Sequence, residues 1–224
     1  MAEQLTFNLP VLTALGREDF FVSDANALAA ERLEHPETWP NGKLVLTGPT
    51  GAGKTHLAQI WATTHGSEVI GATPLATRDI PAQANALAIE VPENMDAATE
   101  EALFHLHNHM LAQRLPLLLI SREPPARWPL KLPDLKSRME ATDVVQIAAP
   151  DDALLSAVLV KLFTDRQIQI APNLIPWIIA RTERSFAAIQ ATVAALDAAA
   201  LAEKRAITRP FARRVLDNMT KDAR

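Results

Sequence analysis

The length, composition and charge of the chain exclude several classes of protein. The chain has 224 residues, enough for one large or two small domains, and 48% of them are hydrophobic, enough for a packed core. The absence of cysteine excludes a disulfide framework and a cysteine-ligated metal, and it fits the reducing cytoplasm where we expect the protein. No apolar run approaches membrane-spanning length, and the first residues lack the basic start and apolar core of a signal peptide.

The net charge of −4 is divided unevenly along the chain. Residues 181–224 contain nine Lys and Arg against five Asp and Glu, so this part carries +4 and the remainder carries −8. The basic part could contact an anionic partner or close over a nucleotide, or it could be an ordinary solvated helix surface.

Two segments precede the first core strand. Residues 4–9 read Gln-Leu-Thr-Phe-Asn-Leu, which by itself predicts an edge strand or a terminus with little fixed structure. An Ala- and Leu-rich helix follows residue 26, and Ser23 or Asp24 is its expected N-cap. Pro36 and Pro40 are expected to end this unit.

A phosphate-binding loop is predicted at residues 48–55, which read G-x-x-x-x-G-K-T. The apolar run 44–46 before it predicts a buried strand, and a helix is expected from residue 54 to about residue 64. Glycines allow backbone N–H groups to turn inward around phosphate oxygens, and the helix N-terminus adds its dipole. Lys54 would neutralise the β- and γ-phosphates, and the Thr55 hydroxyl would hold Mg²⁺. The predicted nucleotide-binding residues are Gly48, Pro49, Thr50, Gly51, Ala52, Gly53, Lys54 and Thr55.

Two later strands are expected to bring polar side chains to the same site. The apolar run 86–91 contains Glu90, at the place of a Walker-B acid that reaches the Mg²⁺ shell. The run 115–120 ends at Ser121, whose hydroxyl could touch the γ-phosphate or its attacking water. Shorter strands are expected at 68–70 and 143–147.

The residue after Glu90 bears on hydrolysis. Many NTPases place a second acid there to polarise the attacking water, whereas this chain has Val91, and Glu93 follows only after Pro92. Since valine cannot orient water, the sequence favours nucleotide binding over efficient hydrolysis and leaves open whether the chain is itself an ATPase.

The helix expected at 96–113, with Asp96 as its N-cap, carries three histidines. His105 and His109 are four residues apart and share one face, a spacing that can bind a metal. No glutamate stands between them as in H-E-x-x-H and no third ligand is evident, so these two and His107 are expected to be partly exposed helix residues.

The pattern changes at residue 151, after which apolar residues recur at helical spacing only. Strands alternating with helices, followed by helices alone, predict an α/β fold with a parallel sheet flanked by helices and a small all-α domain. We expect an N-terminal peptide over 1–12, a nucleotide-binding domain over 13–150 and a helical lid domain over 151–224.

In this order the motifs resemble those of AAA+ ATPases and, more closely, of the Hda-type regulators related to the replication initiator DnaA. The resemblance covers about residues 13–219 and implies an AAA+ P-loop core with a helical lid. Leu-Lys-Ser-Arg, ending at Arg138, is similar to the DnaA segment that carries the arginine finger. Ser121 and Arg184 match the positions called sensor 1 and sensor 2. Phe21 and Val22 are similar to the segment near the adenine site.

Two features resemble Hda-type proteins more than DnaA. We expect no helix-turn-helix domain after the lid. The peptide 4–9 resembles the short motif by which replication proteins dock on the β sliding clamp, with Gln4, Leu5, Phe7 and Leu9 as contact residues. The resemblance implies a negative regulator of replication initiation that binds ADP or ATP with Mg²⁺ and is held on the DNA-loaded clamp. Arg138 would act in trans on ATP bound to DnaA. DNA contact would be mostly indirect, no membrane is implied, and a homo-oligomer is allowed.

Two other functions remain open at this point. An autonomous AAA+ ATPase of the clamp-loader or helicase-loader type would turn over ATP by itself, which Val91 disfavours. A DnaA paralogue that binds DNA through its basic lid would show an affinity that falls steeply with salt, even without the clamp. Under the preferred hypothesis the catalytic residues are Arg138, Glu90 and Ser121.

Overall fold

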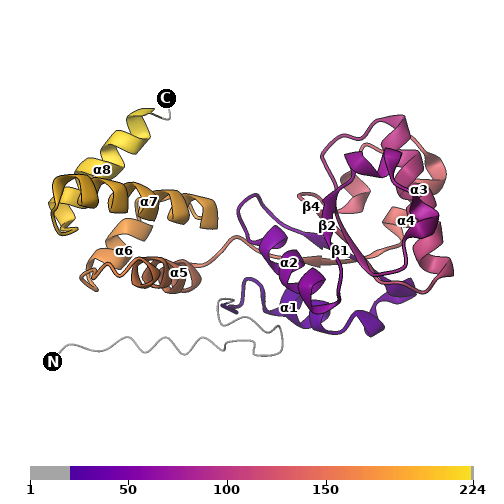
Figure 1. Cartoon of the computed structure of the whole chain (residues 1–224), viewed down its shortest axis with the longest axis horizontal. Helices are drawn as coiled ribbons and strands as arrows, with labels where there is room; N and C mark the ends of the chain where they lie inside the picture. The colour runs from indigo at the N-terminus through magenta and orange to yellow at the C-terminus, as the bar shows by residue number, and fades with distance from the viewer. Residues whose placement is uncertain (1–20, 223–224) are drawn as a thin grey trace. The chain divides into compact units, whose positions relative to one another are not determined.

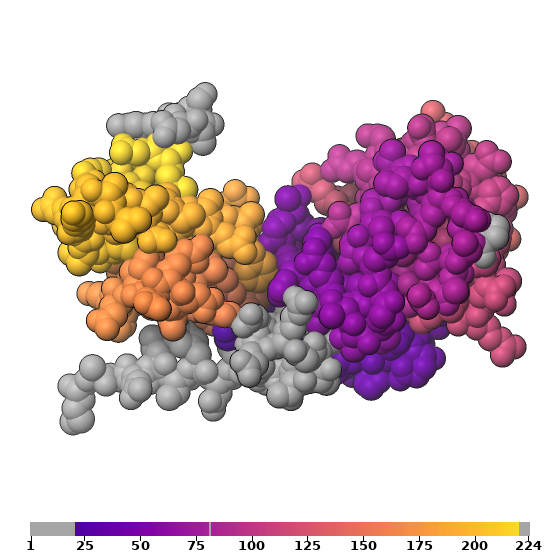
Figure 2. Space-filling view, in the orientation of Figure 1, coloured from indigo at the N-terminus to yellow at the C-terminus, as the bar shows by residue number. Residues whose placement is uncertain are grey.

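The computed structural model describes residues 21–222, which divide into two compact units (Figures 1 and 2). Asn26–Ala148 belong to a unit built on a sheet. The second unit contains Phe21–Ala25 and the helical residues from Ala149 onward.

The sheet of the first unit is entirely parallel, with strand order β2-β3-β4-β1-β5. The strands are β1 (Lys43–Thr47), β2 (Val69–Gly71), β3 (Leu87–Glu90), β4 (Leu117–Ser121) and β5 (Asp143–Gln146). Every residue of β1 and β4 is buried, because helices cover both faces of a parallel sheet, and this explains their continuous apolar sequences.

Helices α3 and α4 pack on one face of this sheet, and α1 and α2 on the other (Figure 1). Their bounds are α1 (Ala27–Glu34), α2 (Lys54–Thr64), α3 (Ala97–Ala112) and α4 (Pro133–Glu140). Short 3₁₀ helices are η2 (Pro36–Thr38), η3 (Pro40–Gly42), η4 (Thr73–Thr77), η5 (Ile80–Ala82) and η6 (Pro125–Arg127). The Asp96 side chain caps α3 by accepting a 2.8 Å bond from the Thr99 N–H, as predicted. The prediction for α1 is wrong, because its N-cap is Asn26 rather than Ser23 or Asp24.

The second unit is a helical bundle with its own core. It contains α5 (Asp152–Asp165), α6 (Leu174–Ile179), α7 (Phe186–Glu203) and α8 (Arg209–Asp222). Asp151 caps α5 by accepting from the Leu154 N–H, and Ser185 caps α7 by accepting from the Ala188 N–H. The core includes Leu155, Leu159, Phe163, Ile178, Ile189, Val193 and Leu196.

One of the described helices, α7, is long and apolar enough to cross a membrane by length and composition alone. In this respect α7 differs from the expectation that no apolar run approaches spanning length, because its many alanines raise the mean hydropathy to 1.3. Core helices meet the same criterion, and Ile189, Val193 and Leu196 of α7 lie in the core of the bundle.

Two buried bases lie near the amino ends of the strands. Lys43 begins β1 and is 2% exposed, and burial, with a smaller effect of the Arg138 charge, lowers its pKa to about 8. His107 on α3 is 5% exposed, so the expectation of a partly exposed side chain is wrong for this histidine. Burial, followed by the charges of Lys43 and Arg138, lowers the pKa of His107 to about 4.

We expect His107 to make the protein less stable as the pH falls from 6.5 to 4. Its folded pKa lies below its unfolded value, so the unfolded chain binds more protons in this window and protonation favours unfolding. The loss is about 2 kcal/mol once partial solvent screening is allowed for. Urea unfolding at pH 7 and pH 4 should therefore show a smaller pH effect for His107→Gln than for wild type. The exposed His105→Gln is the control, and identical pH effects in all three proteins would contradict this prediction.

Candidate functional site

The loop from Gly48 to Thr55 connects the end of β1 to the start of α2, as a phosphate-binding loop requires. A Cβ atom at position 48 would collide with the Ile147 carbonyl oxygen, so only glycine fits there. Gly53 has a φ of 92°, which glycine adopts without strain at the start of α2. The glycines at positions 48 and 53 therefore allow a backbone conformation of the loop that residues with a Cβ atom would not adopt.

Lys54 lies over the loop that precedes it. Its Nζ donates to the carbonyl oxygens of Gly48 at 2.7 Å and Pro49 at 2.9 Å. Burial lowers the pKa of Lys54, the charge of Arg122 lowers it further, and Glu90 raises it. This ammonium group is positioned to neutralise a phosphate held by the loop.

Thr55 and Glu90 meet across the site, where the Thr55 hydroxyl donates a 2.6 Å hydrogen bond to Glu90 Oε1. A hydroxyl and a carboxylate at this separation are oxygen ligands of the kind that Mg²⁺ prefers, so the residues present fit this ion. Because the carboxyl ends of parallel strands share one edge of the sheet, Ser121 at the end of β4 lies beside Glu90 at the end of β3. Lys54, Thr55, Glu90 and Ser121 line one pocket of about 340 Å³.

Three details in and near this pocket bear on hydrolysis. The Ser121 hydroxyl donates to the Glu123 carbonyl oxygen at 2.7 Å. Glu93 pairs with Arg122, whose Nη1 lies 3.1 Å from Glu93 Oε1. Val91, the residue after Glu90, is buried, and its N–H donates to the Ile120 carbonyl oxygen. Its apolar side chain offers no group that could orient a water molecule.

Arg122 is a pocket residue that sequence reasoning missed. It lines the pocket beside Lys54 and lowers the pKa of that lysine. The available signal was its place directly after Ser121, at the strand edge where the phosphate loop also lies.

Arg138 lies at the opposite edge of the sheet from this pocket. It is near the end of α4, just before β5 begins, and its charge lowers the pKa of Lys43 at the start of β1. The phosphate loop begins at the other end of β1, a strand of five residues that spans about 15 Å. The structure therefore does not bring Arg138 to the phosphate loop of its own chain.

The Arg138 guanidinium has an aromatic neighbour on α3. Its Cζ lies 5.1 Å from the centroid of the Phe104 ring on α3. Within the part of the chain that the structure describes, no carboxylate is within ion-pair distance of this half-buried side chain. The guanidinium thus keeps its hydrogen-bonding capacity for another molecule.

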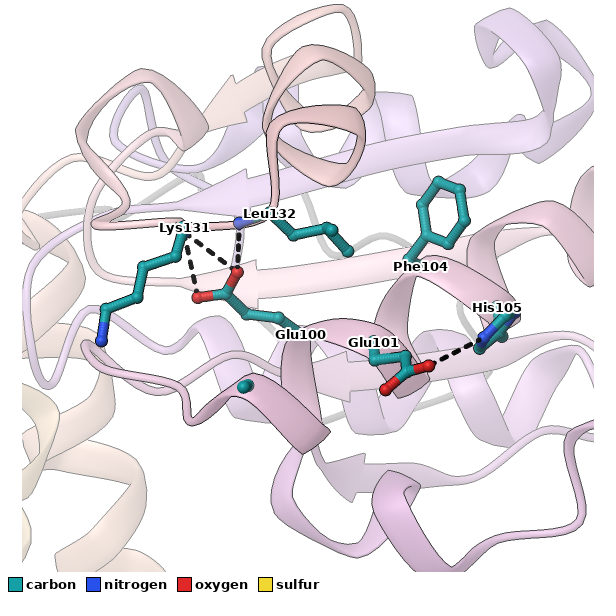
Figure 3. A pocket seen from close by; sticks show the side chains of 7 residues that line it. Glu100, Glu101, Phe104, His105, Lys131 and Leu132 are labelled. Atoms are coloured by element: carbon teal, nitrogen blue, oxygen red, sulfur yellow. Dashed lines mark hydrogen bonds and ion pairs between the residues drawn. The ribbon is translucent and has the colours of Figure 1, made fainter.

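A second pocket, of about 450 Å³, adjoins Phe104 (Figure 3). Glu100, which is 2% exposed, accepts bonds of 2.8–3.2 Å from the backbone N–H groups of Lys131 and Leu132. These bonds tie α3 to the segment that leads into α4, as the dashed lines in Figure 3 show. The helices carrying Phe104 and Arg138 are therefore fixed relative to each other.

Three other predicted site residues belong to the helical unit. Arg184 belongs to the helical unit, where its Nη2 lies 3.1 Å from Asp152 Oδ1. Phe21 and Val22 also belong to that unit. The predicted clamp-binding residues Gln4, Leu5, Phe7 and Leu9 lie outside the described residues. His105 pairs with Glu101 and His109 with the Gln83 carbonyl, so these two histidines have separate partners.

Comparisons with known proteins match both units. Residues 152–216 match the family model of the lid domain of Hda. An uncharacterized protein from Haemophilus influenzae is 31% identical over 119 residues, which span 53% of this chain and about half, 52%, of that relative.

Solved structures match the fold at low sequence identity. Domain III of the Thermotoga maritima replication initiator DnaA gives a TM-score of 0.77 at 16% identity, over 90% of this chain and 95% of that chain. AMPPCP-bound DnaA from Aquifex aeolicus gives 0.66 at 17% identity, over 78% and 62%. A RuvB mutant from Thermotoga maritima gives 0.65 at 16% identity, over 86% and 67%. The chain therefore has the AAA+ fold that DnaA and RuvB share, and its residues 152–216 are similar to the Hda lid, which confirms the predicted fold class and resemblance.

Proposed function

We propose that this protein is a negative regulator of replication initiation, which stimulates hydrolysis of ATP bound to DnaA by supplying Arg138 in trans. The match of residues 152–216 to the Hda lid model supports this kind of regulator. The observation that carries the proposal is the position of Arg138, at the sheet edge opposite its own phosphate loop and without an acidic partner among residues 21–222.

The protein's own site would bind ADP or ATP with Mg²⁺. The loop from Gly48 would hold the phosphates, Lys54 would neutralise them, and Thr55 and Glu90 would hold the metal. Arg184 in the lid would respond to the nucleotide, and Phe21 and Val22 would lie on its adenine side. DnaA from Aquifex aeolicus, which shares the fold, was solved with AMPPCP.

Turnover at this site would be slow. Val91 offers no group that could orient a water molecule, and Glu93 is paired with Arg122. The chain would therefore retain its nucleotide while a partner's nucleotide is hydrolysed, which argues against an autonomous ATPase.

Arg138 would act on the nucleotide of a neighbouring DnaA subunit. A guanidinium group presents a planar fork that matches phosphate oxygens and stabilises the charge that develops on the transferring phosphoryl group. Phe104 would hold this fork in place through its ring face.

The N-terminal peptide would place the protein on the sliding clamp, in the cytoplasm. The test is the hydrolysis rate of ATP prebound to DnaA, with this protein present and with or without DNA-loaded clamp. We expect stimulation only with the clamp, and we expect Leu5→Ala/Phe7→Ala to abolish it. Absence of stimulation by the wild-type protein under both conditions would refute the proposed function.

We expect loss of the contact between Phe104 and Arg138 to have an intermediate effect on the stimulated hydrolysis rate. Phe104→Leu should lower the stimulated hydrolysis rate about 5- to 30-fold, because a cation–π contact of about 1–2 kcal/mol no longer orients Arg138. Phe104→Tyr keeps an aromatic face and should retain most of the rate. Single-turnover assays on DnaA-bound ATP measure both variants, and equal rates for Phe104→Leu and wild type would contradict this role.

A further inference from the structure

The helical unit carries a cationic surface that the proposed function does not use. Trp177 on α6 lies against two arginines: Arg181 Cζ is 4.3 Å and Arg209 Cζ 5.4 Å from its ring centroid. Because both distances end at one ring, the two guanidinium carbons are less than about 10 Å apart, which is within a Debye length at 0.1 M salt. The two positive charges therefore repel each other, because salt screens charges at this separation only in part.

Among the residues that the structure describes, no acidic side chain compensates these charges. Within residues 21–222, neither Arg181 nor Arg209 has a carboxylate at ion-pair distance. Other arginines of the same unit do have one, and these pairs are Arg166–Asp197, Arg184–Asp152, Arg213–Asp217 and Arg214–Glu203. Since four other arginines of this unit are paired, the unpaired state of Arg181 and Arg209 distinguishes this surface.

The turn before α8 extends the positive surface. Lys204 and Arg205 are exposed, and in the described part of the chain neither forms an ion pair. Arg205 lines a pocket of about 540 Å³ at the start of α8, and the same lining includes Thr208 and Pro210, which flank Arg209 in the sequence. We call Trp177, Arg181, Lys204, Arg205 and Arg209 together the Trp177 surface.

We propose that the Trp177 surface binds the phosphate backbone of DNA. Guanidinium groups bind phosphate oxygens through paired hydrogen bonds, and a polyanion would relieve the repulsion between Arg181 and Arg209. An aromatic ring among cations is also typical of surfaces on which nucleic-acid bases stack. Residues 181–224 carry +4 in a chain whose remainder carries −8, so a polyanion would be drawn to this end of the protein.

This contact would be independent of base sequence and sensitive to salt. Each arginine that neutralises a phosphate of duplex DNA adds about 0.9 to the slope of log affinity against log salt. Arg181 and Arg209 together should therefore account for a slope of about 1.8. The proposal does not rest on the action on DnaA, since the surface contains neither Arg138 nor a phosphate-loop residue.

The test measures DNA binding by the full chain without DnaA, clamp or nucleotide. Fluorescence anisotropy of a labelled duplex and a labelled single strand is followed from about 50 to about 200 mM salt. The test variant is Arg181→Gln/Arg209→Gln. The matched control is Arg166→Gln/Arg213→Gln, which removes the same charge from arginines that already have acidic partners. Circular dichroism establishes that both variants are folded.

We expect the test variant to bind duplex DNA about tenfold more weakly at low salt, with a slope reduced by about 1.8. The control should remain within about twofold of wild type. The proposal is overturned if wild type shows no salt-dependent DNA binding, or if the two variants lose affinity equally. It is also overturned if poly-glutamate of equal charge competes as well as DNA does, because the surface would then bind acidic protein. None of these outcomes bears on the hydrolysis assay.

Discussion

Arg138→Ala is expected to lower the clamp-dependent hydrolysis of DnaA-bound ATP by about 10³-fold or more, since an arginine finger contributes 10³–10⁵ in rate. Removing the guanidinium leaves the charge on the transferring phosphoryl group unneutralised. Arg138→Lys keeps the charge without the planar fork, so it should recover only part of the rate. Single-turnover hydrolysis of labelled ATP on DnaA measures all three proteins.

The controls for this prediction come from the same helix. Lys136→Ala removes an exposed charge two residues away and should leave the stimulated rate within about twofold of wild type. Arg138→Ala should also bind ADP as wild type does, because Arg138 lies at the far edge of the sheet from the phosphate loop. Normal stimulation by Arg138→Ala, or loss of its own nucleotide, would show that Arg138 has another role.

Lys54→Ala should weaken binding of ADP or ATP to this protein by about 100-fold. The Lys54 ammonium lies over the carbonyls of Gly48 and Pro49, and a charged hydrogen bond to phosphate contributes up to about 3 kcal/mol. Fluorescence titration with a labelled adenine nucleotide measures the affinity. Lys161→Ala, in the helical unit, is the matched control, since Lys161 pairs with Asp165 there.

In the same assay, Glu90→Gln distinguishes the contribution of the metal ion to nucleotide affinity from the contribution of the Lys54 contact with phosphate. It removes the carboxylate that accepts from Thr55, so its effect should appear with Mg²⁺ and vanish with EDTA. Unchanged affinity for Lys54→Ala would contradict the assignment of this loop as the nucleotide site.

The parts of the site that the sequence predicts are those formed by neighbouring residues or by strand ends. The loop from Gly48 to Thr55 is contiguous, so its pattern already specifies a strand, a turn and a helix. Glu90 and Ser121 end strands, and parallel strands place their carboxyl ends at one edge. For these residues local pattern and topology are enough.

The contacts that the sequence does not predict join residues far apart in the chain. Burial of His107 depends on how α3 packs beside Lys43 at the start of β1, which no local pattern encodes. The contact of Arg138 with Phe104 depends on the packing of α4 against α3. The charge of the helical unit is visible in the sequence, but its concentration around Trp177 is a tertiary feature.

The central claim is that Arg138 acts on a nucleotide held by another protein, and one measurement tests it most directly. DnaA is loaded with radiolabelled ATP and this protein with unlabelled ATP, or the reverse, and single-turnover hydrolysis is followed with DNA-loaded clamp. The account predicts rapid loss of label from DnaA that requires Arg138, and slow loss from this protein's own site. Rapid turnover of this protein's own label, with the label on DnaA unchanged, would contradict it.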